Sequence, residues 1–378
     1  MSDLYVGLMS GTSLDGVDAA LVEFGGDAER PDSARLVAFR TEPYDAGFAS
    51  RLMDAVAGRS GSRDLCDLGF ELGERFSGAV LALLADAGVA ASEVAAIGSH
   101  GHTIWHRPPA ADRPGATLQI GESAVLAEQT EIDVVSDFRV RDVAAGGHGA
   151  PLTPLFDLLV LAEPDRGRAI QNLGGMGNVT GLPRPGDEAR PIAFDTGPGV
   201  ALLDAATRKV TGGRLAFDVD GRLAAEGAVI EDALAPWLAD PFFAESPPRS
   251  TGRERFGDAA LDPWLDRFSA EQPEDLLATL TELTARSVSD SYRFLGFRPD
   301  EVLLCGGGAR NPELCRRIER RLDGIPVLPL DGTGWDADAR EAAAFALLAR
   351  QHVLGIRADL GWATGAPAAR VLGKRTPA

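Results

Sequence analysis

Apolar and polar residues alternate on both sides of a short polar turn near the start of the chain. Apolar side chains stand at every second position over residues 4–8 and again over 17–21, which is the period of a strand with one buried face. The stretch between them is rich in Gly, Ser and Thr. We therefore expect a β-hairpin over residues 1–24. Its turn amides can approach an anion because Gly11 and Gly16 carry no Cβ.

Two further glycine clusters follow apolar strands. Residues 169–180 repeat the plan of strand, glycine-rich turn and outgoing strand, around Gly174 and Gly175. The apolar run 302–305 leads into a third cluster and then a helix. Other phosphate motifs do not fit the first turn: a Walker A loop needs a lysine where Val17 stands, and the glycine spacing of a dinucleotide fingerprint is absent.

Two such hairpins about half a chain apart suggest two related domains. The pairing, with a late Gly-Gly-Gly turn, resembles the actin, Hsp70 and sugar-kinase superfamily, in which the hairpins hold nucleotide phosphates and the third turn lies against adenosine. The resemblance implies an α/β, two-domain actin-like ATPase (ribonuclease H-like) fold, with mixed sheets flanked by helices and a cleft between domains. The candidate nucleotide-binding residues are Gly11, Thr12, Ser13, Leu14, Asp15, Gly16, Val17, Asp18, Gly174, Gly175, Gly306, Gly307 and Gly308.

The remaining pattern alternates strands with helices, which is typical of α/β proteins. We expect strands over 36–39, 96–100, 118–120 and 133–138, helices over 45–88, 276–283 and 287–294, others near Leu202, Leu223 and 341–348, and a loop over 247–254. The Gly-rich run 145–151 indicates a boundary. We therefore assign residues 1–150, joined by 351–378, to the first domain and residues 151–350 to the second.

Composition narrows the possible partners. The net charge of −19 argues against nucleic acid and anionic membranes, and no apolar run is long enough to span a bilayer. Asp3 stands too early for a signal peptide, and three cysteines, an odd number, favour a reducing cytoplasm. Only Lys209 and Lys374 are lysines, so a polyphosphate must be bound by amides, arginines and a metal ion.

The chemistry centres on Asp195, which an apolar strand delivers to its end beside Gly197 and Gly199. A general base needs such a rigid support and open space. The alternative is a cap on the helix that follows. Three nucleotide-loop candidates in the same chain favour the base.

Other polar groups also have two interpretations. Asp15 could hold a Mg²⁺-bound water or stabilise its turn. His100, with His102 and His106 in the same glycine-containing loop, suggests hydrogen bonds to a sugar or, less well, a zinc site. Arg139, at a strand end, suits a carboxylate or an ion pair with Asp142. Glu341 stands in a first helical turn, where it could be only an acid that matches the helix dipole.

Motifs in order along nearly the whole chain resemble the anhydro-N-acetylmuramic acid kinase family: Met9–Asp18, Ser99-His100-Gly101, Gln119-Ile120-Gly121, Asp137-Phe138-Arg139, Gly149–Leu152, Asn172–Gly175, Phe194–Gly199 and Glu341-Ala342. The resemblance implies transfer of the ATP γ-phosphate to O6 of 1,6-anhydro-N-acetylmuramic acid, with hydrolytic ring opening, during peptidoglycan recycling. It makes Asp195 the base and places His100, Arg139 and Glu341 at the sugar. A homodimer is a further implication.

Three positions depart from the family pattern. His102 and His148 stand where Gln is more frequent, and Val200 stands where Asn is usual. The histidines keep a polar group, whereas Val200 loses one beside the catalytic loop. Two alternatives stay open: a conventional sugar kinase, in which Asp195 deprotonates a substrate hydroxyl, and an ATP-driven regulatory module.

Overall fold

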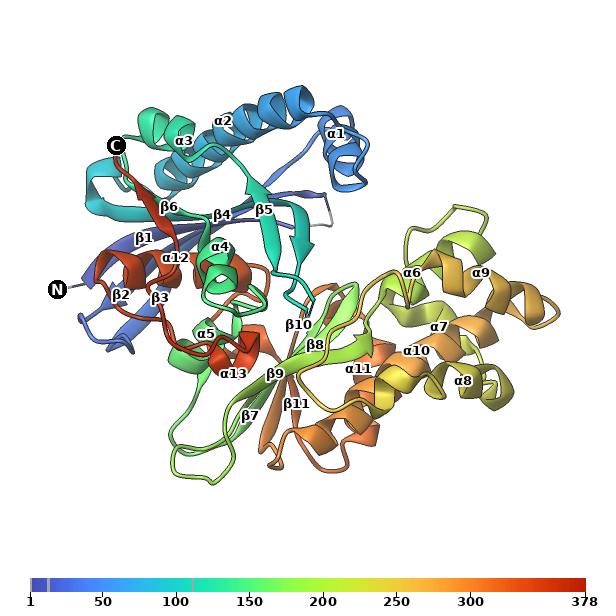
Figure 1. The fold of residues 1–378 in the computed structure, drawn as a ribbon. Helices are drawn as coiled ribbons and strands as arrows, with labels where there is room; N and C mark the ends of the chain where they lie inside the picture. Colours follow the sequence, from blue (N-terminus) through green and yellow to red (C-terminus); the bar gives the residue numbers. More distant parts are fainter. Residues whose placement is uncertain (1, 12–13, 111) are drawn as a thin grey trace. The chain divides into compact units, whose positions relative to one another are not determined.

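The computed structural model describes residues 2–11, 14–110 and 112–378. The chain divides into two compact units, unit 1 with Met1–Leu161 and Asp338–Ala378 and unit 2 with Ala162–Ala337. Each unit contains a sheet and flanking helices (Figure 1).

The strands of unit 1 are β1 (Ser2–Ser10), β2 (Gly16–Gly25), β3 (Ser33–Pro43), β4 (Val94–Arg107), β5 (Ala116–Ile120), β6 (Val134–Ser136) and β12 (Lys374–Thr376). Its helices are α1 (Ala46–Val56), α2 (Ser62–Ala87), η1 (Ala91–Glu93), α3 (Ser123–Thr130), α4 (Phe138–Ala144), α5 (Pro154–Phe156), η2 (Asp157–Leu161), α12 (Arg340–Val353) and α13 (Gly361–Thr364).

The strands of unit 2 are β7 (Arg168–Leu173), β8 (Met176–Leu182), β9 (Ile192–Pro198), β10 (Glu301–Cys305) and β11 (Val327–Pro329). Its helices are α6 (Ala201–Val210), η3 (Val219–Gly221), α7 (Arg222–Glu226), α8 (Glu231–Leu238), η4 (Pro241–Ala244), α9 (Asp258–Arg267), α10 (Pro273–Ser291), η5 (Tyr292–Phe294), η6 (Gly307–Arg310), α11 (Pro312–Arg321) and η7 (Leu330–Thr333).

The two sheets share one topology. In unit 1 the order is β3-β2-β1-β4-β6, and in unit 2 it is β9-β8-β7-β10-β11. In each, the first three strands pair antiparallel and the last two are added in parallel. Unit 1 adds β5 beside β4 and β12 beside β6. This repeated order is the ribonuclease H-like topology, and it confirms the predicted actin-like fold class, including both hairpins.

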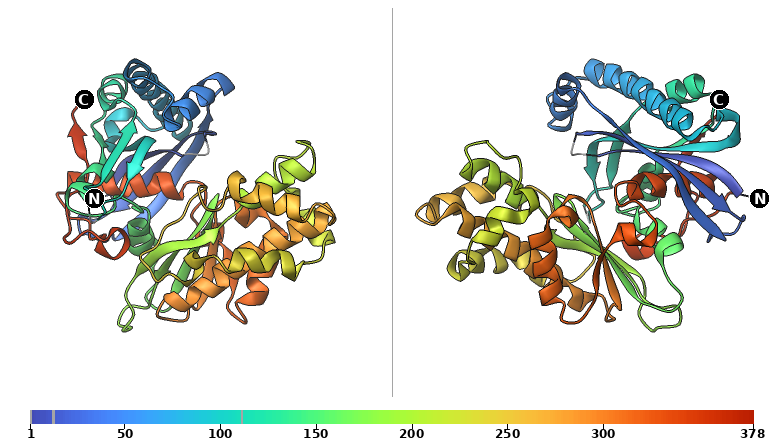
Figure 2. Two further views of the ribbon diagram at one scale, coloured as in Figure 1. Left: turned by 45° about the vertical axis from the view of Figure 1, so that its right-hand side comes forward. Right: turned by 180° about the vertical axis from the view of Figure 1, so that it is seen from behind.

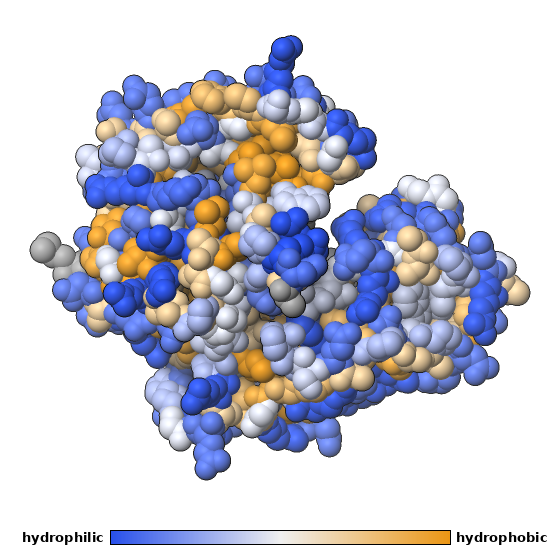
Figure 3. All heavy atoms as spheres, in the orientation of Figure 1, coloured by the Kyte–Doolittle hydropathy of each residue, from blue (hydrophilic) through white to orange (hydrophobic). Residues whose placement is uncertain are grey.

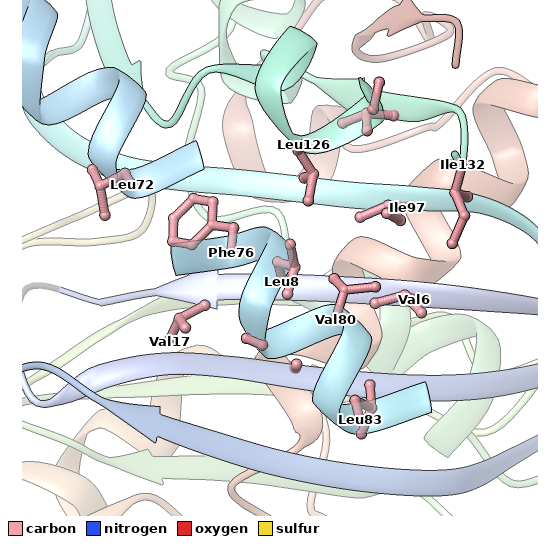
Figure 4. Packing of buried hydrophobic residues seen from close by; sticks show 14 of the residues in the cluster. Val6, Leu8, Val17, Leu72, Phe76, Val80, Leu83, Ile97, Leu126 and Ile132 are labelled. Carbon is pink, nitrogen blue, oxygen red and sulfur yellow. The ribbon is translucent and has the colours of Figure 1, made fainter. Parts of the chain in front are cut away.

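Helices cover both faces of the unit 1 sheet. On one face, Val6 and Leu8 of β1 pack in a buried cluster with Phe76 and Val80 of α2 (Figure 4). Phe76 and Val80 are four residues apart, which places both apolar side chains on one helical face. On the other face lies α12 (Figure 2). It approaches so closely that a Cβ on Gly7 would overlap its backbone.

The unit boundaries differ from those expected. The glycine run 145–151 lies inside unit 1 because the amide of Gly149 donates to Asp142 of α4, at 2.7 Å. Helix α12, most of which was assigned to the second domain, residues 151–350, also belongs to unit 1. It packs on β1 and β4, and Arg340 at its start forms a buried ion pair with Asp157.

Two local predictions are wrong. The strand expected over 96–100 was to end in a polar loop, but it continues as β4 to Arg107 because β5 supplies a pairing partner. The strand expected over 133–138 ends at Ser136, because Asp137 adopts a left-handed φ of 57° and α4 begins at Phe138. Arg139 therefore lies in a first helical turn rather than at a strand end. Within the residues described, no helix is long and apolar enough to cross a membrane.

Candidate active site

Asp195 lies within β9, paired with Asn178 of β8. The strand continues to Pro198, three residues beyond the predicted end. One carboxylate oxygen, Oδ2, accepts a hydrogen bond from the backbone amide of Thr251 at 2.8 Å. Helix α6 starts after Val200, which gives no side-chain cap. Asp195 therefore does not cap that helix.

The loop that faces Asp195 is fastened by Arg249. Its Nε donates to the backbone oxygen of Asp195 at 2.9 Å, and the amide of Asp195 donates back to the Arg249 carbonyl at 3.3 Å. Nη1 of Arg249 donates to the carbonyls of Phe242, Phe243 and Glu245. The guanidinium is thus used to hold backbone and fixes the loop along β9.

Burial raises the pKa of Asp195 to about 6. The Thr251 amide and the positive charge of Arg249 act in the opposite direction, and Glu254 adds to the increase. A carboxylate with such a pKa is largely ionised at neutral pH and is basic enough to accept a proton, as a general base requires.

The structure brings the second and third glycine clusters together. Strands β7 and β10 are parallel neighbours, with Asn172 opposite Cys305. A Cβ on Gly306 would meet the side chain of Asn172 and the backbone at Gly174, and Gly306 has a left-handed φ of 79°. Beside the turn, the amides of Gly199 and Val200 donate to the carbonyls of Gly175 and Gly174. Gly307 faces open space.

The first hairpin turn is partly outside the described residues, which exclude Thr12 and Ser13. Leu14 adopts a left-handed φ of 62°, an uncommon conformation for a non-glycine residue, and its amide donates to Gly11. Asp15 is exposed next to Gly16 and Val17, at the start of β2.

Asp18 on β2 accepts a hydrogen bond from the Thr41 hydroxyl at 2.6 Å. Burial raises the pKa of Asp18 to about 6, against the Thr41 hydrogen bond, and the negative charges of Asp15 and Glu341 add to the rise. Glu341, in the first turn of α12, is thus electrically coupled to the β1–β2 hairpin.

Arg139 and His100 form a hydrogen-bonded pair. Arg139 Nε donates to His100 Nε2 at 2.8 Å, while His100 Nδ1 contacts the carbonyl of Gly101 at 2.8 Å. His100 is therefore neutral with its proton on Nδ1. Burial first, and then the adjacent Arg139, hold the pKa of His100 well below its usual value.

Arg139 also donates to the carbonyl of Gly149 at 2.8 Å. The ion pair with Asp142 that sequence left open is not observed: Asp142 accepts from Gly149 and Thr364 instead. Burial lowers the pKa of Arg139 to about 10, although Glu341 and Asp142 favour its charged form. Arg139 keeps its charge at neutral pH beside a negative side chain, Glu341, to which it is not bonded.

The three histidines of β4 have separate hydrogen-bond partners. His102 Nδ1 contacts the Ser10 hydroxyl at 2.9 Å and His106 Nδ1 contacts Thr117 at 3.1 Å. Ser10 in turn contacts Tyr44 at 2.7 Å. Among the described residues no group of three or more His, Cys, Asp or Glu could hold a metal ion. The zinc interpretation therefore gains no support from these residues.

His100 also borders a hollow of about 340 Å³ in unit 1, between α2, β4 and β5. Its wall combines the apolar side chains of Phe70 and Leu118 with Gln119 and the buried, unpartnered hydroxyl of Ser99. In Figure 3, hydrophobic residues gather over this part of unit 1.

Sequence reasoning missed the loop residues that touch Asp195. Residues 247–254 were expected only as a loop, yet they supply Arg249 and Thr251. The signal that could have found them is the run Arg249–Arg253, Arg-Ser-Thr-Gly-Arg, in a chain almost without lysine.

A family model described as anhydro-N-acetylmuramic acid kinase matches residues 3–378. A protein of that name from Gloeobacter violaceus is 45% identical over 377 residues, covering 99% of both chains. One from Xanthomonas axonopodis pv. citri is 44% identical over 388 residues, covering 100% of this chain and 99% of its own.

Among solved structures, component A of (R)-2-hydroxyglutaryl-CoA dehydratase from Acidaminococcus fermentans is 12% identical, with a TM-score of 0.47, covering 92% of this chain and 98% of its own. A likeness of that size carries no argument about function.

Proposed function

Because the chain belongs to the anhydro-N-acetylmuramic acid kinase family, we propose that it phosphorylates O6 of 1,6-anhydro-N-acetylmuramic acid with ATP while water opens the anhydro ring. The product is N-acetylmuramic acid 6-phosphate, which returns cell-wall sugar to metabolism. The observation that carries the mechanism is Asp195, a carboxylate with a raised pKa that is fixed by Thr251.

Asp195 accepts a proton from the water that attacks the anomeric carbon. The bond between that carbon and the bridging oxygen breaks, and the oxygen takes the electron pair. It then attacks the γ-phosphorus, and the phosphorus–oxygen bond to ADP breaks. Ring opening therefore generates the nucleophile, and one base serves both steps.

Arg139 binds the lactyl carboxylate, and His100 orients Arg139. Both nitrogens of His100 are already engaged, with Arg139 and Gly101, so the imidazole positions the guanidinium rather than contacting the sugar directly. Glu341, at the start of α12, accepts a hydrogen bond from a sugar hydroxyl. These roles rest on the family resemblance and on the Arg139–His100 hydrogen bond.

ATP is held at the three glycine clusters. Open backbone at Gly307 and the packed turns at Gly174 and Gly175 suit close approach of a nucleotide. Mg²⁺ fits a site with one exposed carboxylate, because it usually keeps several waters and takes its other ligands from phosphate. Asp15 would hold it through water. When bound, the ion would neutralise phosphate charge.

The test is purified protein with Mg²⁺-ATP and a panel of anhydro and free amino sugars. ADP should form with 1,6-anhydro-N-acetylmuramic acid, and in ¹⁸O-water the label should enter the anomeric hydroxyl. Label in the phosphate ester would contradict the coupled mechanism. Turnover of free sugars only would indicate a conventional sugar kinase, and sugar-independent turnover would indicate a regulatory ATPase.

The proposal places this reaction in the cytoplasm, where ATP is supplied. From the family resemblance we also propose a homodimer, which sedimentation velocity at micromolar concentration would show as a species of about twice the 39.7 kDa chain mass.

A further inference from the structure

The loop between η4 and α9 carries three arginines with different surroundings. Arg249 is buried and holds backbone carbonyls. Arg255 pairs with Asp240 and Glu245, at 3.6 and 3.7 Å. Arg253 is exposed and forms no hydrogen bond or ion pair with a described residue, although its charge favours the ionised form of Asp204, in the first turn of α6. The cation of this loop that remains available is therefore Arg253.

Arg253 lies beside the second glycine turn. A Cβ built on Gly175 would be 3.8 Å from Nη2 of Arg253 and 3.8 Å from the side chain of Ala201. Ala201 begins α6, and its amide and that of Val200 already donate to the carbonyls of Gly175 and Gly174, so backbone groups cap the start of this helix. The group beside this turn that favours an anion is therefore the guanidinium of Arg253, whose planar donors suit a phosphate.

The two lysines of the chain are not available to a polyphosphate, so its cations must be arginines, in a chain whose net charge is −19. Lys209 pairs with Asp262 at 2.8 Å and Lys374 pairs with Asp137 at 2.9 Å. A guanidinium can bind two phosphate oxygens at once, which an ammonium does less well.

We propose that Arg253 binds the terminal phosphate of ATP and stabilises the charge on the phosphoryl group as it moves to O6. This inference rests on the proposed function. Arg253 keeps its protons throughout: the phosphorus–oxygen bond to ADP breaks, its electron pair stays with ADP, and the new bond forms to the sugar oxygen.

The same loop thus contacts the proposed base and carries the proposed phosphate-binding arginine. Thr251 binds the carboxylate of Asp195, and Arg253 stands two residues further along, beside Gly175. A loop fixed by Arg249 therefore sets the spacing between base and phosphate cation.

The test compares Arg253→Gln and Arg253→Lys with Arg255→Gln, which removes a neighbouring but paired guanidinium. Cationic groups of this kind contribute about 10³- to 10⁵-fold to kcat in other phosphoryl-transfer enzymes. Arg253→Gln should lower kcat about 10³-fold, Arg253→Lys less, and Arg255→Gln by no more than about threefold. The melting temperature and the Kd for the anhydro sugar should not change in Arg253→Gln.

Guanidinium ion at millimolar concentration should restore part of the activity of Arg253→Ala, which a purely structural role would not allow. A wild type that does not use the anhydro sugar overturns the proposed function. An active wild type with a fully active Arg253→Gln overturns this inference alone. A lower melting temperature with unchanged kcat does the same, and assigns Arg253 to balancing the charge of nearby Asp204.

Discussion

The environment of Asp195 combines two opposing influences on one carboxylate. Burial raises its pKa to about 6, while the Thr251 amide and Arg249 favour the ionised form. The balance leaves a base that is ionised at neutral pH yet still accepts a proton. Arg249 acts on it through both position and charge, since it also fastens the loop that carries Thr251.

The pH dependence of the reaction should reveal this balance. Because the ionised carboxylate is needed, kcat/KM should fall tenfold per unit below about pH 6. Arg249→Met removes a charge that lowers the pKa, so the acid limb should move to higher pH, and Arg249→Lys should move it less. An acid limb that stays in place in Arg249→Met would contradict the assignment.

Removing the base gives a separate prediction. Asp195→Asn should lower kcat about 10²- to 10⁴-fold while sugar binding survives.

Arg139 offers a second residue-level prediction. Arg139→Ala should weaken the binding of 1,6-anhydro-N-acetylmuramic acid by about 2 to 5 kcal/mol, the usual cost of breaking a buried charge pair. The matched control is 1,6-anhydro-N-acetylglucosamine, which lacks the lactyl carboxylate. Isothermal titration should show that the mutation makes the two sugars bind almost equally. If the preference for the muramic sugar persists, Arg139 does not bind its carboxylate.

Helix α12 can pack closely on the sheet because two sheet residues that face it, Gly7 and Gly98, have no side chain. A Cβ on Gly7 would overlap the carbonyl of Ala342, and one on Gly98 would overlap that of Phe345. The first of these contacts lies next to Glu341, so small residues on β1 and β4 determine where this carboxylate stands. The glycines of the sheet are therefore as important for the site as those of the turns.

Gly7→Ala should consequently destabilise the protein and displace Glu341. Overpacking of this kind typically costs about 1 to 3 kcal/mol, and the KM for sugar should rise. The control is Gly78→Ala in α2, where nothing lies within 4 Å of an added Cβ. That change should be neutral or stabilising by about 0.5 to 1 kcal/mol. Equal denaturation midpoints for the two variants would show that α12 adjusts freely.

Elements encoded in local pattern were predictable, and elements that depend on distant partners were not. Both hairpins and α2 follow from apolar spacing. Residues 101–107 became a strand only because β5 pairs with them. Likewise, Asp195 and the glycine clusters are visible as motifs, whereas Thr251 becomes relevant because its loop returns to a strand 56 residues away.

At the scale of the whole chain, the recurrence of the hairpin correctly anticipated two units of one topology, but not their boundaries. The glycine run at 145–151 reads locally as a linker. Its attachment to Thr364, through the amide of His148 and the side chain of Asp142, and the return of α12 to unit 1 are long-range contacts. Composition is a more direct guide to the long-range electrostatic field, because the net charge does not depend on how the chain folds.

The charge of −19 gives the last prediction. The long-range field repels anionic substrates, and salt shortens its reach from about 30 Å at 0.01 M to about 8 Å at 0.15 M. kcat/KM for Mg²⁺-ATP should therefore rise, by roughly two- to tenfold, between these ionic strengths. With ATP saturating, kcat/KM for neutral 1,6-anhydro-N-acetylglucosamine should not change. A decrease for ATP would mean that nearby arginines, Arg253 among them, govern its approach despite the net charge.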